Sequence, residues 1–320
     1  MNSGKRVEES APTSVRGRLA QWRQLLERCG RKATRKRVHA LRVVTLRLQA
    51  ELECDLADLP RASHQAQAIL RFGKRAEKLR QALGPVRELD VWIGKLRGLR
   101  GSLNKTDEYV PRSMRECVGG IDRLEERLKK KRIVAEKRLV AAINKPGRLG
   151  GRLVKASEDV EQSLSDHIFG ADAGIAEELA ARFRAVRAEF STFSEENLHE
   201  FRKRIKMVRY LAEIHAGANR ATAQIASQMK KVQSAIGEWH DWQELGREAH
   251  HGHTKSKPLA ELLDTVTAES FETALSTVHA ISAQMQGEDP VQDQDLHPEV
   301  RKISAHGDLT LLADLNKKLA

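Results

Sequence analysis

The stretch LHEFRKRIKMVRY, residues Leu198–Tyr210, predicts a helix with two different sides. At about 100° of rotation per residue, positions three or four apart fall on the same side of a helix. The apolar side carries Leu198, Phe201, Ile205 and Val208. An adjoining arc of about 120° carries His199, Arg202, Lys203, Lys206 and Arg209. The stretch therefore predicts a helix that packs on one side and presents a row of positive charge beside it.

A similar stretch, VHALRVVTLRLQA, occupies Val38–Ala50, half a chain length earlier. The same helical projection brings Arg35, His39 and Arg42 onto one side, next to an apolar side. The motif therefore occurs twice, and its spacing favours two similar halves.

Composition points to an all-α chain of 320 residues. Hydrophobic residues make up 40% and charged residues 31%, prolines are few, and Leu, Ala, Arg, Lys and Glu dominate. These are the residues that favour helices. The strongest cluster of helix breakers, Pro146-Gly147 and Gly150-Gly151, predicts the boundary between the halves. The expected organisation is a disordered N-terminus (1–14), a first helical half (15–147), a second helical half (152–286) and a tail with a short helix (287–320).

Start and stop signals predict individual helices. Thr34 is expected to cap the helix of the first motif, and Ser194 with Asn197 to start the helix of the second. Gly84 and Gly237 are expected to break the helices that follow the two motifs, and a further interruption is expected near Gly119-Gly120. The acids just after the first two breaks would then lie in first turns and cap them or pair with motif arginines: Glu88, Asp90 and Asp241.

Charge is divided unevenly along the chain. Residues 1–150 hold 36 Lys and Arg against 17 Asp and Glu, whereas residues 151–320 hold 20 against 27. The cations of the LHEFRKRIKMVRY stretch therefore stand in an acidic half, so a general basic bias does not explain them. The strongly basic first half implies an anionic partner, such as nucleic acid, a phosphate polymer or an acidic membrane surface.

Several protein classes find no support in the sequence. Cys29, Cys54 and Cys117 are odd in number and far apart, which suggests free thiols in a reducing compartment. No apolar run reaches the roughly 18 residues needed to span a bilayer, so a cytoplasmic protein is expected. Nucleotide-binding and hydrolase motifs are missing, no catalytic carboxylate pair is indicated, and the short cluster His250–His253 lacks the ligand spacing of a metal site.

Taken together, the two H-x-x-R helices and the two glycines resemble the CHAD family, the conserved histidine α-helical domain. The second half is similar to the family pattern LH-x-x-RK-x-x-K-x-x-RY followed by LG-x-x-x-D, with Ile236 in place of the Leu. The first half resembles the pattern through His39, Arg42, Arg47 and the run LGPVRELDV at 83–91. It departs from the family at Leu46 and Gln49, where arginine is usual, and these departures are expected to weaken its contacts with an anion.

The resemblance implies two pseudo-symmetric helical bundles, of about four helices each, around a basic central cavity. It also implies non-catalytic binding of inorganic polyphosphate, with association to polyphosphate granules and no cofactor. Polyphosphate repeats its charge along a chain, so it suits donors repeated every three to four residues of a helix. The residues expected to bind it are Arg35, His39, Arg42, Arg47, Lys74, Lys78, His199, Arg202, Lys203, Lys206, Arg209, Lys230 and Lys231.

Two points stay open at this stage. His39 and His199 either donate to phosphate as imidazolium or orient the neighbouring arginines. The chain is alternatively a nucleic-acid-binding helical protein, because its first half is basic, or a metal-dependent phosphohydrolase or nucleotidyl transferase. Against these alternatives, aromatic residues are only 4% of the chain and the acidic residues are scattered.

Overall fold

The computed structural model describes residues 14–57, 59–103, 112–145, 147–164, 174–217, 219–251 and 256–286. Helices are the only regular structure within these ranges, so the predicted all-α class is confirmed. The predictions of disorder in residues 1–13 and of a short helix in residues 287–320 lie outside the described ranges.

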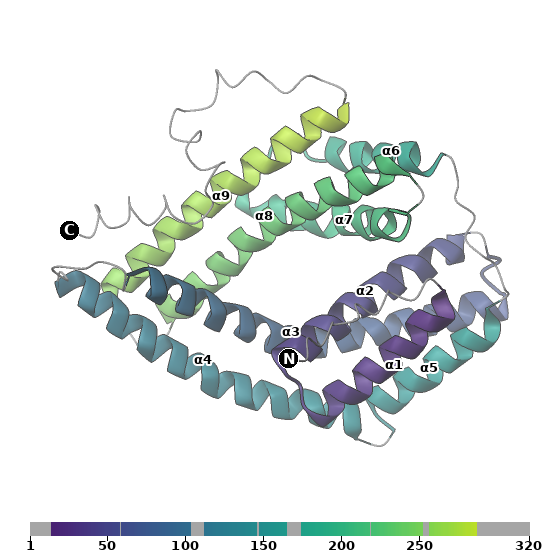
Figure 1. Cartoon of the computed structure of the whole chain (residues 1–320), viewed down its shortest axis with the longest axis horizontal. Coiled ribbons are helices and arrows are strands. Elements are labelled where there is room, and N and C mark those ends of the chain that lie inside the picture. The colour runs from purple at the N-terminus through teal and green to yellow at the C-terminus, as the bar shows by residue number, and fades with distance from the viewer. Residues whose placement is uncertain are drawn as a thin grey trace, which may run out of the picture. The chain divides into compact units, whose positions relative to one another are not determined.

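Nine helices follow one another in the described residues (Figure 1). They are α1 (Val15–Arg31), α2 (Arg35–Ala57), α3 (His64–Leu103), α4 (Arg112–Asn144), α5 (Leu149–Ser163), α6 (Ile175–Ala188), α7 (Glu195–Ile214), α8 (Arg220–His251) and α9 (Lys257–Gln286). None of these nine is long and apolar enough to cross a membrane.

Side chains cap the two motif helices where the sequence predicts their starts. The Thr34 hydroxyl accepts a hydrogen bond from the backbone N–H of Arg37 in the first turn of α2, at 3.4 Å. Before α7, the side-chain oxygen of Asn197 accepts from the backbone N–H of Ser194 at 2.8 Å. Such bonds satisfy backbone donors that lack an acceptor at a helix end. Both predicted starts are confirmed.

Helices α3 and α8 continue through the glycines that were predicted to break them. Pro85 removes one backbone donor from α3, which costs about 3 kcal/mol in a helix interior. The apolar side of α3 nevertheless continues past it, since Val86 is 0% and Leu89 is 7% exposed. Burying such side chains contributes about 1.5–3 kcal/mol each and offsets that cost. The predicted breaks at Gly84 and Gly237 are therefore wrong.

The acids after these glycines consequently lie inside helices and not in first turns. Asp90 of α3 accepts a hydrogen bond from Nε of Arg132, on α4, at 2.9 Å. Its partner is thus a cation outside the two motifs. Glu88 is exposed, and Asp241 is buried within α8.

One further predicted interruption is also wrong, because helix α4 continues through Gly119-Gly120. The break predicted at Pro146-Gly147 and Gly150-Gly151 is present, because α4 ends at Asn144 and α5 begins at Leu149, with Gly150-Gly151 in its first turn. A Cβ built on Gly120 would lie 2.6 Å from Cβ of Ser256. Glycine at this position permits a close approach between segments and does not turn the chain.

The contacts divide the chain into two compact units, each made of two segments. Unit 1 comprises Met1–Arg87 and Val134–Gly170, and unit 2 comprises Glu88–Ile133 and Ala171–Ala320. Helices α3 and α4 each run from one unit into the other. These units therefore differ from the two continuous halves expected on either side of residues 147–152, because α5 packs with α1 and belongs to unit 1.

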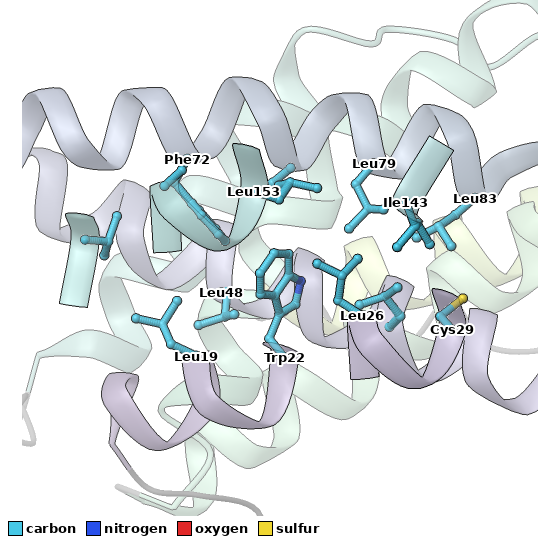
Figure 2. Packing of buried hydrophobic residues seen from close by; sticks show 14 of the residues in the cluster. Leu19, Trp22, Leu26, Cys29, Leu48, Phe72, Leu79, Leu83, Ile143 and Leu153 are labelled. Atoms are coloured by element: carbon cyan, nitrogen blue, oxygen red, sulfur yellow. The ribbon is translucent and has the colours of Figure 1, made fainter. Parts of the chain in front are cut away.

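Trp22 of α1 lies in the middle of the unit 1 core (Figure 2). The indole is fully buried and meets the ring of Phe72, on α3, edge-on with centroids 5.4 Å apart. Its Nε1 donates to the hydroxyl of Thr45, on α2, at 2.9 Å. Leu153 of α5 belongs to the same buried cluster. Helices α1, α2, α3 and α5 thus share one core, which holds the first motif helix in place.

Aromatic rings fix α7 in unit 2. Phe201 of α7 is fully buried, with its centroid 6.3 Å from Phe183 of α6 and 4.9 Å from Phe193 of the α6–α7 turn. On α8, Trp239 packs against Phe271 of α9 with centroids 5.3 Å apart. Helix α8 in turn lies along both α7 and α9 (Figure 1). The apolar side of α7 is therefore held by α6, and α8 lies beside it.

Gly150→Ala should destabilise unit 1, because the added Cβ would lie 2.0 Å from the carbonyl oxygen of Ile143 and backbone would have to move. We expect the free energy of unfolding to fall by about 1–3 kcal/mol, the usual cost of overpacking. The matched control is Gly151→Ala, where the added Cβ meets no atom within 4 Å. It should leave stability unchanged or raise it by up to about 1 kcal/mol. Urea unfolding measures both, and equal midpoints would contradict the packing.

Candidate anion-binding site

The apolar side of α7 determines where its basic side lies. Leu198 and Ile205 are fully buried, and Val208 is 3% exposed. Residues of the adjoining arc then fall at the border between this core and the surface. Arg202 and Arg209 are half-buried there, beside α8. The basic row of α7 is consequently part of a helix–helix border and not a freely solvated surface.

Arg209 is clamped by two side chains. Its Nε donates to Oε1 of Glu213, one turn on, at 2.7 Å, and its Nη1 donates to Oε1 of Gln233 on α8 at 2.8 Å. Gln233 is 6% exposed, and its Nε2 lies 3.5 Å from the carbonyl oxygen of Arg202. One buried amide thus connects both motif arginines of α7 to α8. Sequence analysis did not single out Gln233 or Glu213.

The guanidinium of Arg202 lies against α8 at Gly237. A Cβ built on Gly237 would lie 3.0 Å from Nη2 and 3.4 Å from Cζ of Arg202. Real Cβ contacts are seldom that short, so any larger residue would push the guanidinium away. The glycine that was predicted to break α8 therefore serves to admit an arginine to the helix surface.

His199 of α7 faces His240 of α8, with ring centroids 4.4 Å apart. Nδ1 of each ring is buried and has no hydrogen-bond partner among the described residues. Burial lowers the pKa of His199 to about 4, and His240, Lys203 and Arg202 add to this shift. Burial, followed by Arg202, also lowers the pKa of His240. Both imidazoles are therefore neutral at pH 7.

The sequence prediction did not include His240. A usable signal was its position three residues after Gly237, since such residues lie within about 60° of each other on a continuous helix. The predicted break at Gly237 concealed this relation, because residues on opposite sides of a helix break do not share one helical projection.

The other cations of α7 and α8 occupy different positions. Lys203 is exposed and pairs with Glu200 at 3.2 Å, while Lys206 is half-buried. Lys230 and Lys231 are both exposed on α8. Lys230 lies within about 20° of Gly237 on the helical wheel, whereas Lys231 lies about 120° away. Lys230 thus shares the side of α8 that receives Arg202, and Lys231 does not.

In unit 1 the corresponding side of α2 is less polar. Leu46 and Gln49 stand where α7 carries Lys206 and Arg209, and they are 7% and 8% exposed. His39, unlike His199, is exposed. The first copy therefore has no counterpart of the packed imidazole pair in its motif histidine.

Contacts between α2 and α3 are formed by Arg42 and Gln49. Nη1 of Arg42 lies 3.5 Å from the carbonyl oxygen of Arg80, and Nε2 of Gln49 lies 3.4 Å from that of Gly73. The remaining predicted residues of this unit are Arg35, Lys74 and Lys78, which are exposed, and Arg47, which is half-buried.

The described residues contain no group of three or more His, Cys, Asp and Glu side chains that could hold a metal ion. Nε2 of His250 lies 3.0 Å from Oδ1 of Asp264, and the histidine at 253 is outside the described ranges. The three cysteines are free thiols, as predicted. Burial raises the pKa of Cys117 to about 11, so this thiol stays protonated.

These features define a class of protein: an all-α chain that sets a basic helix against a second helix in each of two units. Comparison with known proteins agrees with this class. The family model of the CHAD domain matches residues 13–250, so the chain belongs to the CHAD domain family. The predicted family is thereby confirmed.

Two solved structures share the fold. PptA from Streptomyces chartreusis is 14% identical, with a TM-score of 0.56 over 86% of this chain and 98% of that one. The CHAD domain from the plant Ricinus communis is 17% identical, with a TM-score of 0.54 over 86% and 91% of the two chains. A search among curated proteins found no match.

The lowered pKa of His199 predicts acid-sensitive stability. Its folded-state pKa of about 4 lies below the ordinary value of 6.5, so the unfolded chain binds more protons between these pH values. The stability due to neutral His199 is present above pH 6.5 and is lost as the pH falls toward 4. His199→Gln should therefore flatten the decline in unfolding free energy over this range. Denaturant unfolding at several pH values tests this, and parallel declines in both proteins would refute it.

Proposed function

We propose that the chain binds inorganic polyphosphate without catalysis, using the basic helix of each unit. The observation that carries this proposal is the arrangement of Arg202 and Arg209, which α8 holds in place through Gly237 and Gln233. Guanidinium groups that are already ordered lose little side-chain entropy when they bind an oxyanion. Membership of the CHAD family supports a binding role.

The spacing of the donors favours a polymer over a single anion. Arg202 and Arg209 are seven residues apart, which is about 10 Å along a helix axis. Lys206 lies between them on the same side. A chain of linked phosphates can contact all three, whereas one phosphate cannot. Binding should be multivalent and should therefore favour long chains.

The remaining parts of the proposal rest on the family resemblance. They are the arrangement of two pseudo-symmetric bundles around one basic pore, and the association of the protein with polyphosphate granules in the cytoplasm. The expected contribution of Lys74, Lys78, Lys230 and Lys231 also belongs to the proposal. Each of these four lysines is exposed on its helix.

Nucleic acid remains the second candidate ligand, because residues 1–150 carry 36 Lys and Arg against 17 acidic residues. It offers the same phosphate chemistry, but the aromatic ring beside Arg209, that of Tyr210, is only 6% exposed and leaves little surface on which a base could stack. Competition distinguishes the two. If DNA displaced long-chain polyphosphate at equal phosphate concentration, the nucleic-acid function would be favoured.

Replacing both Arg202 and Arg209 by Gln should weaken binding of long-chain polyphosphate, measured by calorimetry at low salt. We expect about a tenfold loss for each charge-assisted contact. Arg204→Gln is the control, because Arg204 is exposed on the same helix and pairs with Glu189. The double change Arg42→Gln with Arg47→Gln should cost less than the α7 double change.

These outcomes separate the function from the site. A wild-type chain without affinity for polyphosphate at low salt would reject the function. Equal losses in the Arg204 control and in the α7 double variant would reject the site. Affinity that did not fall with rising salt would contradict binding through phosphate charge.

Gly237→Ala should reduce polyphosphate affinity while preserving the fold. The methyl group would displace the Arg202 guanidinium, which is the end of a flexible side chain, and alanine favours the helix by up to about 1 kcal/mol. We expect affinity to fall by about threefold to tenfold with an unchanged or higher melting temperature. Gly246→Ala is the control on the same helix, because its nearest contact would be at 4.0 Å. A loss of stability in parallel with affinity would show that Gly237 serves packing alone.

A further inference from the structure

The two copies of the motif exchange an arginine and a glutamine. Aligning His39 with His199 places Gln49 opposite Arg209 on the motif helices. On the helices that follow, aligning Gly84 with Gly237 places Arg80 opposite Gln233. The second copy therefore has Arg on the motif helix and Gln on its partner helix. The first copy has Gln on the motif helix and Arg on its partner helix.

Contacts within each unit support this correspondence. In unit 2, Gln233 reaches the carbonyl oxygen of Arg202 at 3.5 Å. In unit 1, Arg42, the counterpart of Arg202, reaches the carbonyl oxygen of Arg80 at 3.5 Å. Residues 80 and 233 thus lie beside the first motif arginine of their own unit. Position 80 in unit 1 therefore corresponds to position 233 in unit 2, and the side chain of Arg80 begins where that of Gln233 begins in unit 2.

Arg80 lacks the partners that hold Arg209. Its Nε is buried and has no hydrogen-bond partner within the described ranges. Arg209, by contrast, donates from Nε to Glu213. Glu53 is the counterpart of Glu213 in the first copy. Burial raises the pKa of the Glu53 carboxyl, and the positive charge of the nearby Arg80 opposes part of this rise. No ion pair between Glu53 and Arg80 is formed in the described structure.

A half-buried guanidinium with an unpaired buried donor carries a desolvation cost that an anion would relieve. The guanidinium of Arg42 adds a second cation close to the backbone of the same residue, 3.5 Å from the carbonyl oxygen of Arg80. Gln49 cannot supply that charge, and its own Oε1 is buried without a partner among the described residues. On this side of α2 and α3, Nε of Arg80 is therefore a buried donor without an acceptor among the described residues.

We infer that Arg80, on α3, is an anion-binding residue of unit 1. Its guanidinium takes the role that the guanidinium of Arg209, on α7, has in unit 2. The ligand class is a phosphate oxyanion within a polyphosphate chain, so the inference rests on the proposed function. Arg80 then joins Arg42, and the loss of arginine at Gln49 does not remove the second guanidinium from this half.

The test is calorimetric titration of the full chain with long-chain polyphosphate at low salt. Arg80→Gln should weaken binding by about tenfold, as expected for one charge-assisted contact. Arg71→Gln is the matched control, because Arg71 is exposed on the same helix about 180° away from Arg80. It should change affinity by no more than about twofold. Equal affinities of the two variants would overturn the inference.

Two further variants separate binding from structure. Gln49→Arg combined with Arg80→Gln recreates the arrangement of unit 2, and it should restore affinity to within about threefold of wild type. Glu53→Gln removes a competing carboxylate, so affinity should be unchanged or higher. A loss in Glu53→Gln as large as that in Arg80→Gln would show that Arg80 serves an internal pair instead. Absence of binding by the wild-type chain would reject the proposed function itself, whatever the variants show.

Discussion

The contact of the Arg202 guanidinium with α8 is the constraint on which the rest of unit 2 depends. A cation can lie on a helix surface only where no side chain covers that surface, and Gly237 leaves it bare. The same approach brings His199 against His240 and lets Gln233 reach both motif arginines. Burial, to which the neighbouring cations add, then lowers the pKa of both imidazoles and keeps them neutral at pH 7. Packing, protonation and the direction of the arginines thus follow from one absent Cβ.

Periodicity was sufficient to predict the helices, their apolar sides and the starts of α2 and α7. It failed wherever a glycine or proline lay inside a long helix, as at Pro85 and Gly237. Local propensity treats such residues as breaks, whereas burial on both sides of them keeps α3 and α8 continuous. Whether a glycine turns a chain or admits a neighbour depends on what lies opposite, and a single sequence does not contain that information.

The candidate site, like the fold, was predictable from the sequence only in part. The residues of α7 were predictable because one helix carries them, and the family match over residues 13–250 agrees with the motif that it contains. Gln233, His240 and Arg80 were missed because they belong to partner helices, where no repeated charge distinguishes them. In the first copy, the departures at Leu46 and Gln49 are visible on the motif helix itself. The position of Arg80 next to Arg42 depends on how α3 packs against α2, which the sequence does not show.

The division of unit 1 into two segments affects the order in which the chain can fold during synthesis. Arg23 of α1 donates to the hydroxyl of Ser157 at 3.3 Å and to a carboxylate oxygen of Glu161 at 2.7 Å, both on α5. These pairs join residues 134 and 138 positions apart. The ribosome must therefore release the whole 88–133 segment of unit 2 before the core around Trp22 can close. Until then the apolar side of α1 lacks α5, and apolar surface that stays exposed during such delayed long-range closure is prone to aggregation.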